Sequence, residues 1–330
     1  MKVGIVGSGL IVDTLFEFIK DLKQIEIMAI TATARSIDKL NKLAKEHNIE
    51  YVYTDYQQFL ENDQYDTVYL GVPNHLHYRM AKQALSAGKN VIVEKPFTSN
   101  YNQAKMLEKI AKERKLIILE AISNQHNPNY HKIKELLPTI GDVKIVVLNY
   151  TQYSSRYDAF KEGVILPAFD YRKSGGALMD LNVYNVHYLV GLFGKPDEVK
   201  YYPNIEYNID TSGILMLSYD SFKAVLIAAK DCGSPLLNCI EGNKGCIYTS
   251  SPLFTLTHFH YQLNKEEPVY YDLCDNAHRM QHEFITFAEI IDNKDYDKAY
   301  KLLKHSIDVM EVLTKARASA DIVFPDDEVI

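Results

Sequence analysis

The stretch GIVGSGLIVD, residues 4–13, places two glycines between a short apolar strand and an amphipathic helix. Gly7 and Gly9 let the backbone turn sharply and let a phosphate group approach it closely. The helix that follows would offer free N–H groups and the positive end of its dipole to that phosphate. In this context the turn predicts a dinucleotide-binding βαβ unit, although a glycine turn without a ligand is the alternative.

Strands and helices alternate from residue 2 to about residue 121. This alternation predicts an α/β domain, residues 1–121, with the doubly wound parallel sheet of a Rossmann fold and helices on both faces. The expected strands are residues 2–6, 25–32, 66–73, 90–94 and 116–121, and the expected helices begin near residues 10, 36, 75 and 101.

The remainder of the chain, residues 122–330, has a different pattern. Longer apolar strands are expected at 143–153, 213–220 and 223–231, and the last two are joined by a tight turn, which indicates an antiparallel hairpin. Two further strands, GCIYTS and LFTLTHFHY, precede helices near 276–293 and 295–318. We expect an α+β domain with an open, mainly antiparallel sheet that binds substrate and mediates oligomerisation.

Composition narrows the class of protein. The 330-residue chain has a net charge of −7, which argues against a nucleic-acid partner. No apolar run approaches the roughly 20 residues of a membrane span, and the N-terminus lacks the pattern of a signal peptide. These features indicate a cytoplasmic protein without a membrane partner.

The four cysteines form no CxxC pair, so neither a zinc site nor a redox dithiol is expected, and buried free thiols are the preferred interpretation. His258 and His260 lie two apart, as metal ligands on one strand face would. No third ligand accompanies them, and we expect no metal.

Residues that choose between NAD and NADP are expected at the end of the second strand, in ITATARS, residues 30–36. An NAD site usually has an acidic residue there, but none occurs from Thr31 to Ser36. Arg35 is present instead and can pair with a 2′-phosphate, which favours NADP. The alternative is that Arg35 is a solvated charge at a helix start. At the third position of the glycine fingerprint the chain has Val12, so we expect slightly wider helix–strand packing.

Lys95 ends the strand NVIVE and precedes Pro96, which restricts its backbone to extended conformations. The carboxyl ends of parallel strands line the ligand crevice, so a lysine held there could hydrogen-bond a reacting hydroxyl or carbonyl. Glu94 could orient Lys95 or balance its charge. A surface lysine before a turn is the commoner alternative.

A second polar group lies in GGALMDLNVYNVHYLVG, residues 175–191. On a helix Asp180 and Tyr184 share one face, and His187 lies near it. Together they could form a proton relay. Alternatively, Asp180 pairs with Lys173 or Arg172, and Tyr184 is a half-buried core ring. The role of His187 stays open.

These motifs, in this order, resemble the Gfo/Idh/MocA family of oxidoreductases. The resemblance is carried by the glycine turn, by GVPNHLHYRMAKQALSAGKNVIVEKPFTSN at 71–100, by residues 175–196 and by SIDVMEVLTKARASADI at the end. It implies that Lys95 is catalytic, with the Asp180–Tyr184 pair matching the dihydrodiol dehydrogenase type. Asn182 and His187 depart from the family pattern. The implied cofactor contacts are Gly7, Gly9, Leu10 and Ile11 at the pyrophosphate, Arg35 and Ser36 at the adenosine ribose, Val72, Pro73, Asn74 and His77 along the cofactor, and Glu94 and Lys95 near the nicotinamide.

We therefore expect an NADP-dependent oxidoreductase that transfers hydride between the nicotinamide and a hydroxyl or carbonyl carbon of a sugar, polyol, diol or small dicarbonyl. Two alternatives stay open: a non-catalytic NADP-sensing regulator and a glycosidase that uses the nicotinamide transiently. A homodimer or homotetramer through the C-terminal sheet is expected.

Overall fold

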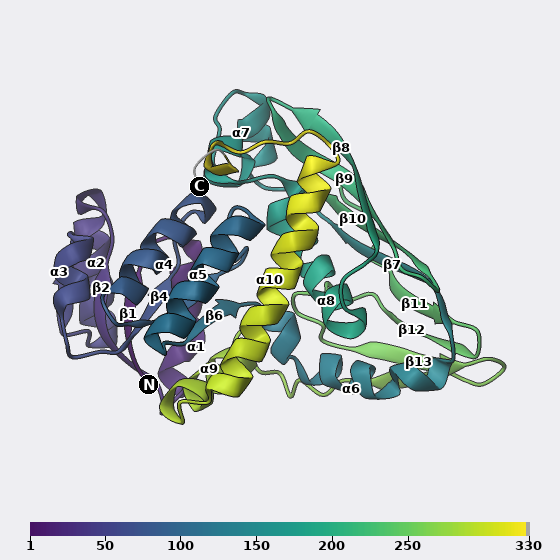
Figure 1. Ribbon diagram of the computed structural model, residues 1–330, viewed down its shortest axis with the longest axis horizontal. Helices are drawn as coiled ribbons and strands as arrows, with labels where there is room; N and C mark the ends of the chain where they lie inside the picture. The colour runs from purple at the N-terminus through teal and green to yellow at the C-terminus, as the bar shows by residue number, and fades with distance from the viewer. Residues whose placement is uncertain (328–330) are drawn as a thin grey trace. The chain divides into compact units, whose positions relative to one another are not determined.

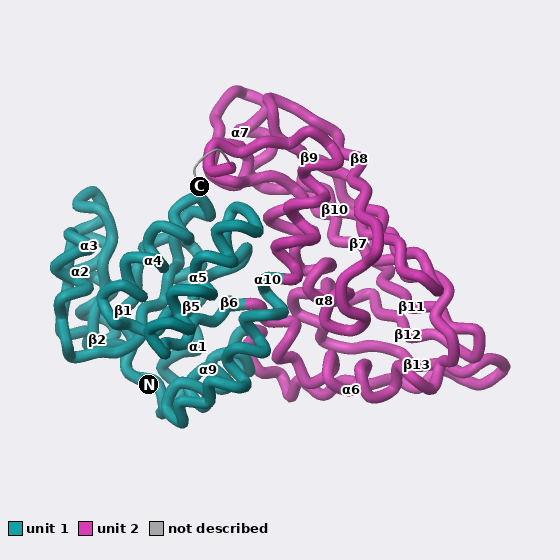
Figure 2. Tube along the Cα trace, in the orientation of Figure 1, with its two compact units in different colours: residues 1–121, 280–307 teal, residues 122–279, 308–330 magenta. Residues whose placement is uncertain are grey.

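The computed structural model describes residues 1–327, and the chain forms two compact units (Figure 2). Unit 1 comprises Met1–Ala121 and Met280–Ile307, and unit 2 comprises Ile122–Arg279 and the chain from Asp308 onward. Residues 280–307, which the sequence analysis assigned to the second domain, thus belong to unit 1.

Unit 1 contains a six-stranded parallel sheet in the order β3-β2-β1-β4-β5-β6, the doubly wound Rossmann order (Figure 1). The predicted fold of this half is confirmed. The three-residue β3 and the six-residue α3 were not predicted, because such short segments carry little periodicity. The strands are β1 (Lys2–Val6), β2 (Glu26–Thr31), β3 (Tyr51–Tyr53), β4 (Thr67–Leu70), β5 (Asn90–Glu94) and β6 (Ile118–Ala121).

Helices cover both faces of this sheet. Val3 and Ile5 of β1 face a core that includes residues of α1, α2 and α9. Between them Gly4 faces the other side, where a Cβ atom would lie 2.6 Å from the Phe59 ring of α3. The helices of unit 1 are α1 (Leu10–Phe18), α2 (Ile37–His47), α3 (Tyr56–Glu61), α4 (His77–Ser86), α5 (Tyr101–Arg114) and α9 (Gln281–Asp292).

α9 belongs to unit 1 because its apolar face completes the core around β1 and α1. Phe284 and Phe287 are at most 1% exposed, and Phe284 makes ring contacts with Phe18 and Tyr69. The N-terminal ammonium of Met1 also donates to the Asp292 carboxylate at 3.0 Å. A helix so distant in sequence joins this sheet through packing that no local pattern encodes.

Unit 2 contains an eight-stranded sheet in the order β14-β13-β12-β11-β7-β10-β9-β8 (Figure 1). Among its described strand pairs only β7 and β10 run parallel, so the predicted mainly antiparallel sheet is confirmed. The predicted hairpin is the β9–β10 pair. The strands are β7 (Val143–Thr151), β8 (Glu198–Glu206), β9 (Ile209–Ser218), β10 (Lys223–Ala229), β11 (Asn238–Gly242), β12 (Gly245–Thr249), β13 (Phe259–Leu263) and β14 (Val269–Tyr271).

The sequence analysis missed β8, β11 and β14. β8 is a polar edge strand that contains Pro203, and proline is tolerated at a sheet edge because its missing N–H is not needed there. Conversely, residues 253–258 were expected as strand, but β13 begins only at Phe259.

One face of the unit 2 sheet is packed and the other is exposed. Along β9, Leu215 and Leu217 are buried, whereas Ile214 and Met216 are each 43% exposed. Figure 1 shows α8 lying on one side of this sheet. The helices of unit 2 are α6 (Pro128–Leu136), α7 (Tyr157–Lys161) and α8 (Val183–Phe193), and α10 (Tyr296–Ala318) begins in unit 1 and continues into unit 2.

The cysteine prediction was wrong in part. All four thiols are free, but Cys232 is exposed and Cys239, Cys246 and Cys274 are only partly buried. Cys232 and Cys274 lie in loops, whereas Cys239 of β11 and Cys246 of β12 lie on adjacent strands of the sheet. Partial burial still raises the pKa of each thiol. Within residues 1–327, no helix combines the length and apolar character that crossing a bilayer requires.

Candidate active site

The glycine turn after β1 packs closely against the ends of the two neighbouring strands, β2 and β4. Gly7 has a φ of +124°, and its N–H donates to the Thr31 carbonyl at 2.8 Å. A Cβ atom on Gly7 would lie 2.2 Å from the carbonyl oxygen of Gly71. Only glycine fits this conformation and this spacing.

Gly9 leaves open space at the start of α1. Its φ is −83°, and a Cβ atom there would meet no atom within 4 Å. α1 begins at Leu10 without a side-chain cap, and the Gly9 carbonyl accepts from the N–H groups of Val12 and Asp13, so the N–H groups of Leu10 and Ile11 are the ones at the helix start that a ligand could use. Gly9 and Leu10 are exposed and Ile11 is partly exposed. This arrangement fits a pyrophosphate, which would occupy the space that a side chain at residue 9 would fill.

Val12 replaces the third glycine of the fingerprint and is fully buried. A Cβ atom on Gly71 would lie 2.9 Å from its Cγ2 atom. The valine is therefore accommodated because residue 71, after β4, is a glycine.

The predicted ribose contacts lie beside the glycine turn. Arg35 is exposed in a short 3-10 turn, Ala34–Ser36. The Ser8 hydroxyl donates to Ser36 Oγ at 3.0 Å. Lys39, which the sequence analysis missed, donates from Nζ to the Ser8 carbonyl and to Asp13, each at 2.8 Å. The available signal in the sequence was its position four residues after Arg35, although Arg35 itself lies in the 3-10 turn before α2.

The loop after β4 carries Val72, Pro73 and Asn74, all at least partly exposed. His77, predicted to line the cofactor, is instead fully buried. Its ring nitrogens lie 2.8 Å from the carbonyl oxygens of Val72 and Pro96. His77 thus ties the loop after β4 to the loop after β5. Burial lowers the pKa of His77, although the two carbonyls oppose that shift.

Glu94 and Lys95 lie at the carboxyl end of β5. Glu94 is 6% exposed and accepts a hydrogen bond from the Tyr69 hydroxyl at 2.7 Å. Tyr69, on the adjacent β4, was not identified from sequence. Lys95 is partly exposed, and the Lys95–Pro96 peptide bond is cis. Because β1, β4 and β5 are neighbours in a parallel sheet, the glycine turn and Lys95 lie along the same edge.

In unit 2, Asp180 lies in a π-helical turn, Leu178–Asn182, that continues into α8. Its Oδ2 atom pairs with Lys230 Nζ at 2.8 Å, and its side chain is 28% exposed. The alternative pairing with Arg172 or Lys173 was wrong, because both of those cations pair with Asp170. Lys230 could not be recognised from sequence, because it lies fifty residues from Asp180.

Tyr184 lies in an aromatic cluster and is 7% exposed. Its ring centroid is 6.0 Å from that of Tyr150 and 5.6 Å from that of Phe254. The Tyr184 carbonyl accepts a hydrogen bond from the Asn124 amide at 2.8 Å. The Arg279 guanidinium lies 5.5 Å from the centre of the Phe254 ring. Asp180 and Tyr184 thus come from one continuous helical segment, whereas Tyr150 is contributed by β7 and Phe254 by the loop before β13.

His187 and Asn182 are both fully buried. Asn182 donates to the Leu226 carbonyl at 3.2 Å and accepts from Asn185, so it fastens the π-helical turn to β10. Its departure from the family pattern therefore has a structural explanation. His187 lies in α8, where its carbonyl accepts from Gln125.

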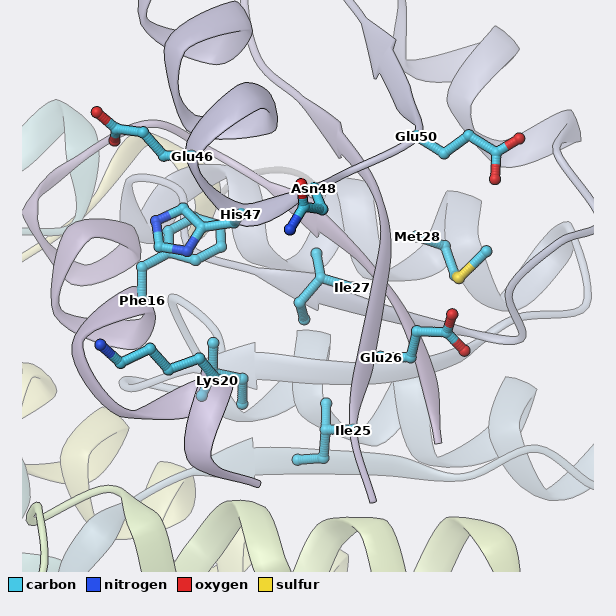
Figure 3. Close-up of a pocket in the computed structure, with 11 residues that line it drawn as sticks. Phe16, Lys20, Ile25, Glu26, Ile27, Met28, Glu46, His47, Asn48 and Glu50 are labelled. Carbon is cyan, nitrogen blue, oxygen red and sulfur yellow. The ribbon is translucent and has the colours of Figure 1, made fainter. Parts of the chain in front are cut away.

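A cavity of about 420 Å³ lies elsewhere in unit 1 (Figure 3). It is lined by Phe16, Glu26, Met28 and His47, among others, near the amino end of β2. The glycine turn follows the carboxyl end of β1, so this cavity is not the nucleotide site. Residues 1–327 contain no group of three histidine, cysteine or acidic side chains arranged to hold a metal.

We next compared the chain with known proteins. The chain is 31% identical to scyllo-inositol 2-dehydrogenase (NADP(+)) of Bacillus subtilis, over 99% of both chains. Residues 1–122 match the Gfo/Idh/MocA family, described as an oxidoreductase family with an NAD-binding Rossmann fold. The chain belongs to the Gfo/Idh/MocA family. It is therefore an NAD(P)-binding oxidoreductase.

Two further proteins are similar to the chain over nearly its whole length, one in sequence and one in fold. Human trans-1,2-dihydrobenzene-1,2-diol dehydrogenase is 24% identical over 99% of both chains. The structure of a 3-ketoreductase from Actinomadura kijaniata, in complex with NADP and TDP-benzene, superposes with a TM-score of 0.83 at 21% identity, over 97% of both chains.

Replacing Gly9 with alanine should separate nucleotide binding from folding. The backbone at residue 9 suits alanine and the space around it is open, so the free energy of unfolding should stay unchanged or rise by about 0.4–1 kcal/mol. Affinity for NADPH should fall at least about tenfold, because the methyl group occupies the phosphate approach. Gly7→Ala is the contrast and should lower both. Unchanged NADPH affinity in Gly9→Ala, by fluorescence titration, would contradict this site.

His77 should make native stability depend on acid pH. Below about pH 6.5 the unfolded chain gains a proton at this residue, and the buried ring resists it. Since the unfolded state then binds more protons, the free energy of unfolding should fall as the pH drops below 6.5. His77→Gln should flatten that dependence in urea titrations from pH 5 to pH 8. His47→Gln, at a half-exposed ring, is the control, and an equal slope in both variants would refute the assignment.

Proposed function

We propose that this protein oxidises a ring hydroxyl of a cyclic polyol or sugar, or reduces the corresponding ketone, with NADP as hydride carrier. The observation that carries the proposal is the ion pair between Asp180 and the buried Lys230. Asp180 lies in the helical segment that also contains Tyr184. A carboxylate held ionised beside a phenol suits transfer of a hydroxyl proton.

The names of two relatives and the aromatic wall of unit 2 support the proposed substrate class. One relative is named for an inositol and another for a dihydrobenzene diol, and both names describe six-membered rings with hydroxyl groups. Tyr150, Tyr184 and Phe254 form an apolar wall in the same unit as Asp180, and Tyr184 follows Asp180 by four residues. Aromatic rings pack well on the C–H face of such a ring, and a carboxylate accepts hydrogen bonds from its hydroxyls. Sugars, open-chain diols and small dicarbonyls are the wider class.

The preference for NADP rests on positive charge at the end of β2. Arg35 is exposed there, Lys39 lies one helical turn further, and no acidic residue occurs between residues 31 and 36. A guanidinium can bind a 2′-phosphate in bidentate fashion. The name of the Bacillus subtilis relative also specifies NADP(+).

The residues of this chain divide the chemical work as follows. Gly7, Gly9, Leu10 and Ile11 would hold the pyrophosphate, with Val72, Pro73, Asn74 and Glu94 further along the cofactor and Arg35 and Ser36 at its ribose. A nicotinamide held by these residues would supply the hydride-accepting chemistry for oxidation of the carbinol carbon. Lys95 hydrogen-bonds the reacting oxygen, Tyr184 donates a second hydrogen bond to it, and Asp180 receives or relays the proton. Tyr69 holds the Glu94 carboxylate in place.

We retain two further proposals about organisation. The nucleotide-binding and substrate-binding roles divide between an N-terminal domain and a C-terminal domain. The exposed face of the unit 2 sheet, with Ile145, Tyr202, Ile214 and Met216 each more than 40% exposed, supports a homodimer or homotetramer through that face. A cytoplasmic location stays a prediction.

Turnover tests the proposed function directly. The purified protein should reduce NADP+ in the presence of scyllo-inositol, other inositols or trans-1,2-dihydrobenzene-1,2-diol, measured by absorbance at 340 nm. Lys95→Met should lower kcat at least about 100-fold, because the hydrogen bond to the reacting oxygen is lost, and should still bind NADPH. Lys109→Met, an exposed lysine on α5, is the control.

Two results would contradict the proposal. NADPH binding without turnover of any cyclic polyol, diol or sugar would favour a nucleotide-sensing regulator. Cleavage of a nitrophenyl glycoside without net change in NADPH would favour a glycosidase.

Arg35→Ala should weaken NADPH binding at least about tenfold and leave NADH binding within about twofold, since only NADPH carries the 2′-phosphate. The measurement is paired fluorescence titration with both nucleotides. Lys42→Ala is the matched control, because Lys42 is a solvent-exposed cation on the same helix, α2, paired with Glu46. Equal losses for NADPH and NADH in Arg35→Ala would overturn the NADP assignment.

A further inference from the structure

Lys230 is a buried cation that directly follows β10, with 2% of its surface exposed. Its ammonium donates to Asp180 Oδ2 at 2.8 Å and to the Ala168 carbonyl at 2.5 Å. It also lies 4.3 Å from the centre of the Phe169 ring. A carboxylate, a carbonyl and an aromatic face thus surround one charge that water hardly reaches.

The two members of this ion pair differ in exposure. The Lys230 side chain is 3% exposed, whereas that of Asp180 is 28% exposed. Removing an ammonium from water is costly unless a partner compensates, so the Asp180 carboxylate offsets part of the cost of burying the Lys230 side chain. In return the cation favours the ionised carboxylate and fixes the position of one of its oxygens.

Other acidic groups near Lys230 have their own donors. Asp210, on β9, is fully buried and accepts from the Leu178 N–H at 2.7 Å and from the Tyr201 hydroxyl at 2.8 Å. Burial raises the pKa of Asp210 to about 6, and the Lys230 charge opposes that shift. Asp231 accepts from the hydroxyls of Thr211 and Ser212. Among these acids in residues 1–327, Asp180 is the one that the ammonium contacts directly.

Lys230 and Asp210 both bind residues of the π-helical turn Leu178–Asn182. Asp210 receives the N–H of Leu178 at the start of the π-helical turn, and Lys230 holds Asp180 two residues later. A Cβ atom on Gly176 would lie 2.0 Å from Asp210 Oδ1, so the chain approaches this carboxylate closely. The orientation of the Asp180 carboxylate is therefore determined by β9 and β10 and not by its own helix alone.

We propose that Lys230 is a positioning residue for the reaction: it keeps Asp180 ionised and fixes its Oδ2 atom, so that the carboxylate is oriented to accept the substrate hydroxyl. This inference rests on the proposed function, because it assumes that Asp180 takes part in the oxidation. Lys230 itself acts through Asp180.

The test is the pH dependence of kcat/KM for the most active polyol with NADP+. In Lys230→Met the acid limb should move up by at least about one pH unit, because the carboxylate is protonated more readily without the cation. At pH 7, kcat should fall at least about tenfold, while the NADPH dissociation constant changes by less than about twofold. In Lys230→Arg the limb should stay near its wild-type position, because the charge is kept, and kcat should fall at least about threefold, because the planar guanidinium displaces the carboxylate.

A double-mutant cycle separates action through Asp180 from an independent effect. Asp180→Asn removes the carboxylate, so adding Lys230→Met should lower kcat by less than about twofold further. Lys89→Met is the matched control. Lys89 is also buried, donates to the carbonyls of Asn62 and Tyr65, and lies 4.6 Å from the Tyr65 ring centre. Lys89→Met should therefore lower the free energy of unfolding without moving the acid limb of the kcat/KM profile.

The outcomes are distinct. Absence of wild-type turnover would refute the proposed function itself. With turnover present, an unmoved acid limb in Lys230→Met, or a full additional loss in the Asp180→Asn background, would overturn the role of Lys230 alone. If Lys230→Met does not fold, Lys230→Arg decides: a kcat equal to that of the wild type would refute the positioning role, and a lower kcat with an unmoved limb would support it.

Discussion

The close approach of two backbone turns at the carboxyl edge of the parallel sheet is the constraint on which the nucleotide site depends. Gly7 turns with a positive φ against the Gly71 carbonyl, and Val12 fills the space beside Gly71. A side chain at residue 7 or residue 71 would force these turns apart. The first turn of α1 would then no longer present its N–H groups beside the open space at Gly9. The nucleotide site thus depends on the lack of a side chain at Gly7, Gly9 and Gly71 as much as on any contact.

The same edge is held together by buried polar groups. His77 joins the loops after β4 and β5 through their carbonyls, and Tyr69 of β4 holds Glu94 at the end of β5. Each of these bonds connects neighbouring strand ends. Lys95 therefore projects from a connection that is fixed on both sides, which suits the catalytic role that we propose for it.

In unit 2 the polar residues between 123 and 129 fix the backbone around the candidate substrate surface. Ser123 donates to the Phe254 carbonyl, Asn124 to that of Tyr184, and Asn127 to that of Thr255. Asn129 adds bonds to the carbonyls of Leu256 and Thr257. These short side chains fix the backbone beneath the aromatic wall, while Lys230 and Asp210 fix the turn that carries Asp180. The candidate substrate surface is thereby positioned by side chains that do not belong to it.

The sequence by itself determined the parts of this protein that local patterns encode. The strand–glycine–helix pattern, the alternation through residue 121, the hairpin of β9 and β10 and the ordered family motifs were sufficient to predict both folds and the nicotinamide cofactor. Only the tertiary structure decided that α9 completes the core of unit 1, that Lys39 reaches the glycine turn, and that Asp180 pairs with Lys230 and not with its neighbours Arg172 or Lys173. Periodicity and turn residues act over a few positions along the chain. The partner of a buried charge is selected by which strands become neighbours, and that depends on packing across tens or hundreds of residues.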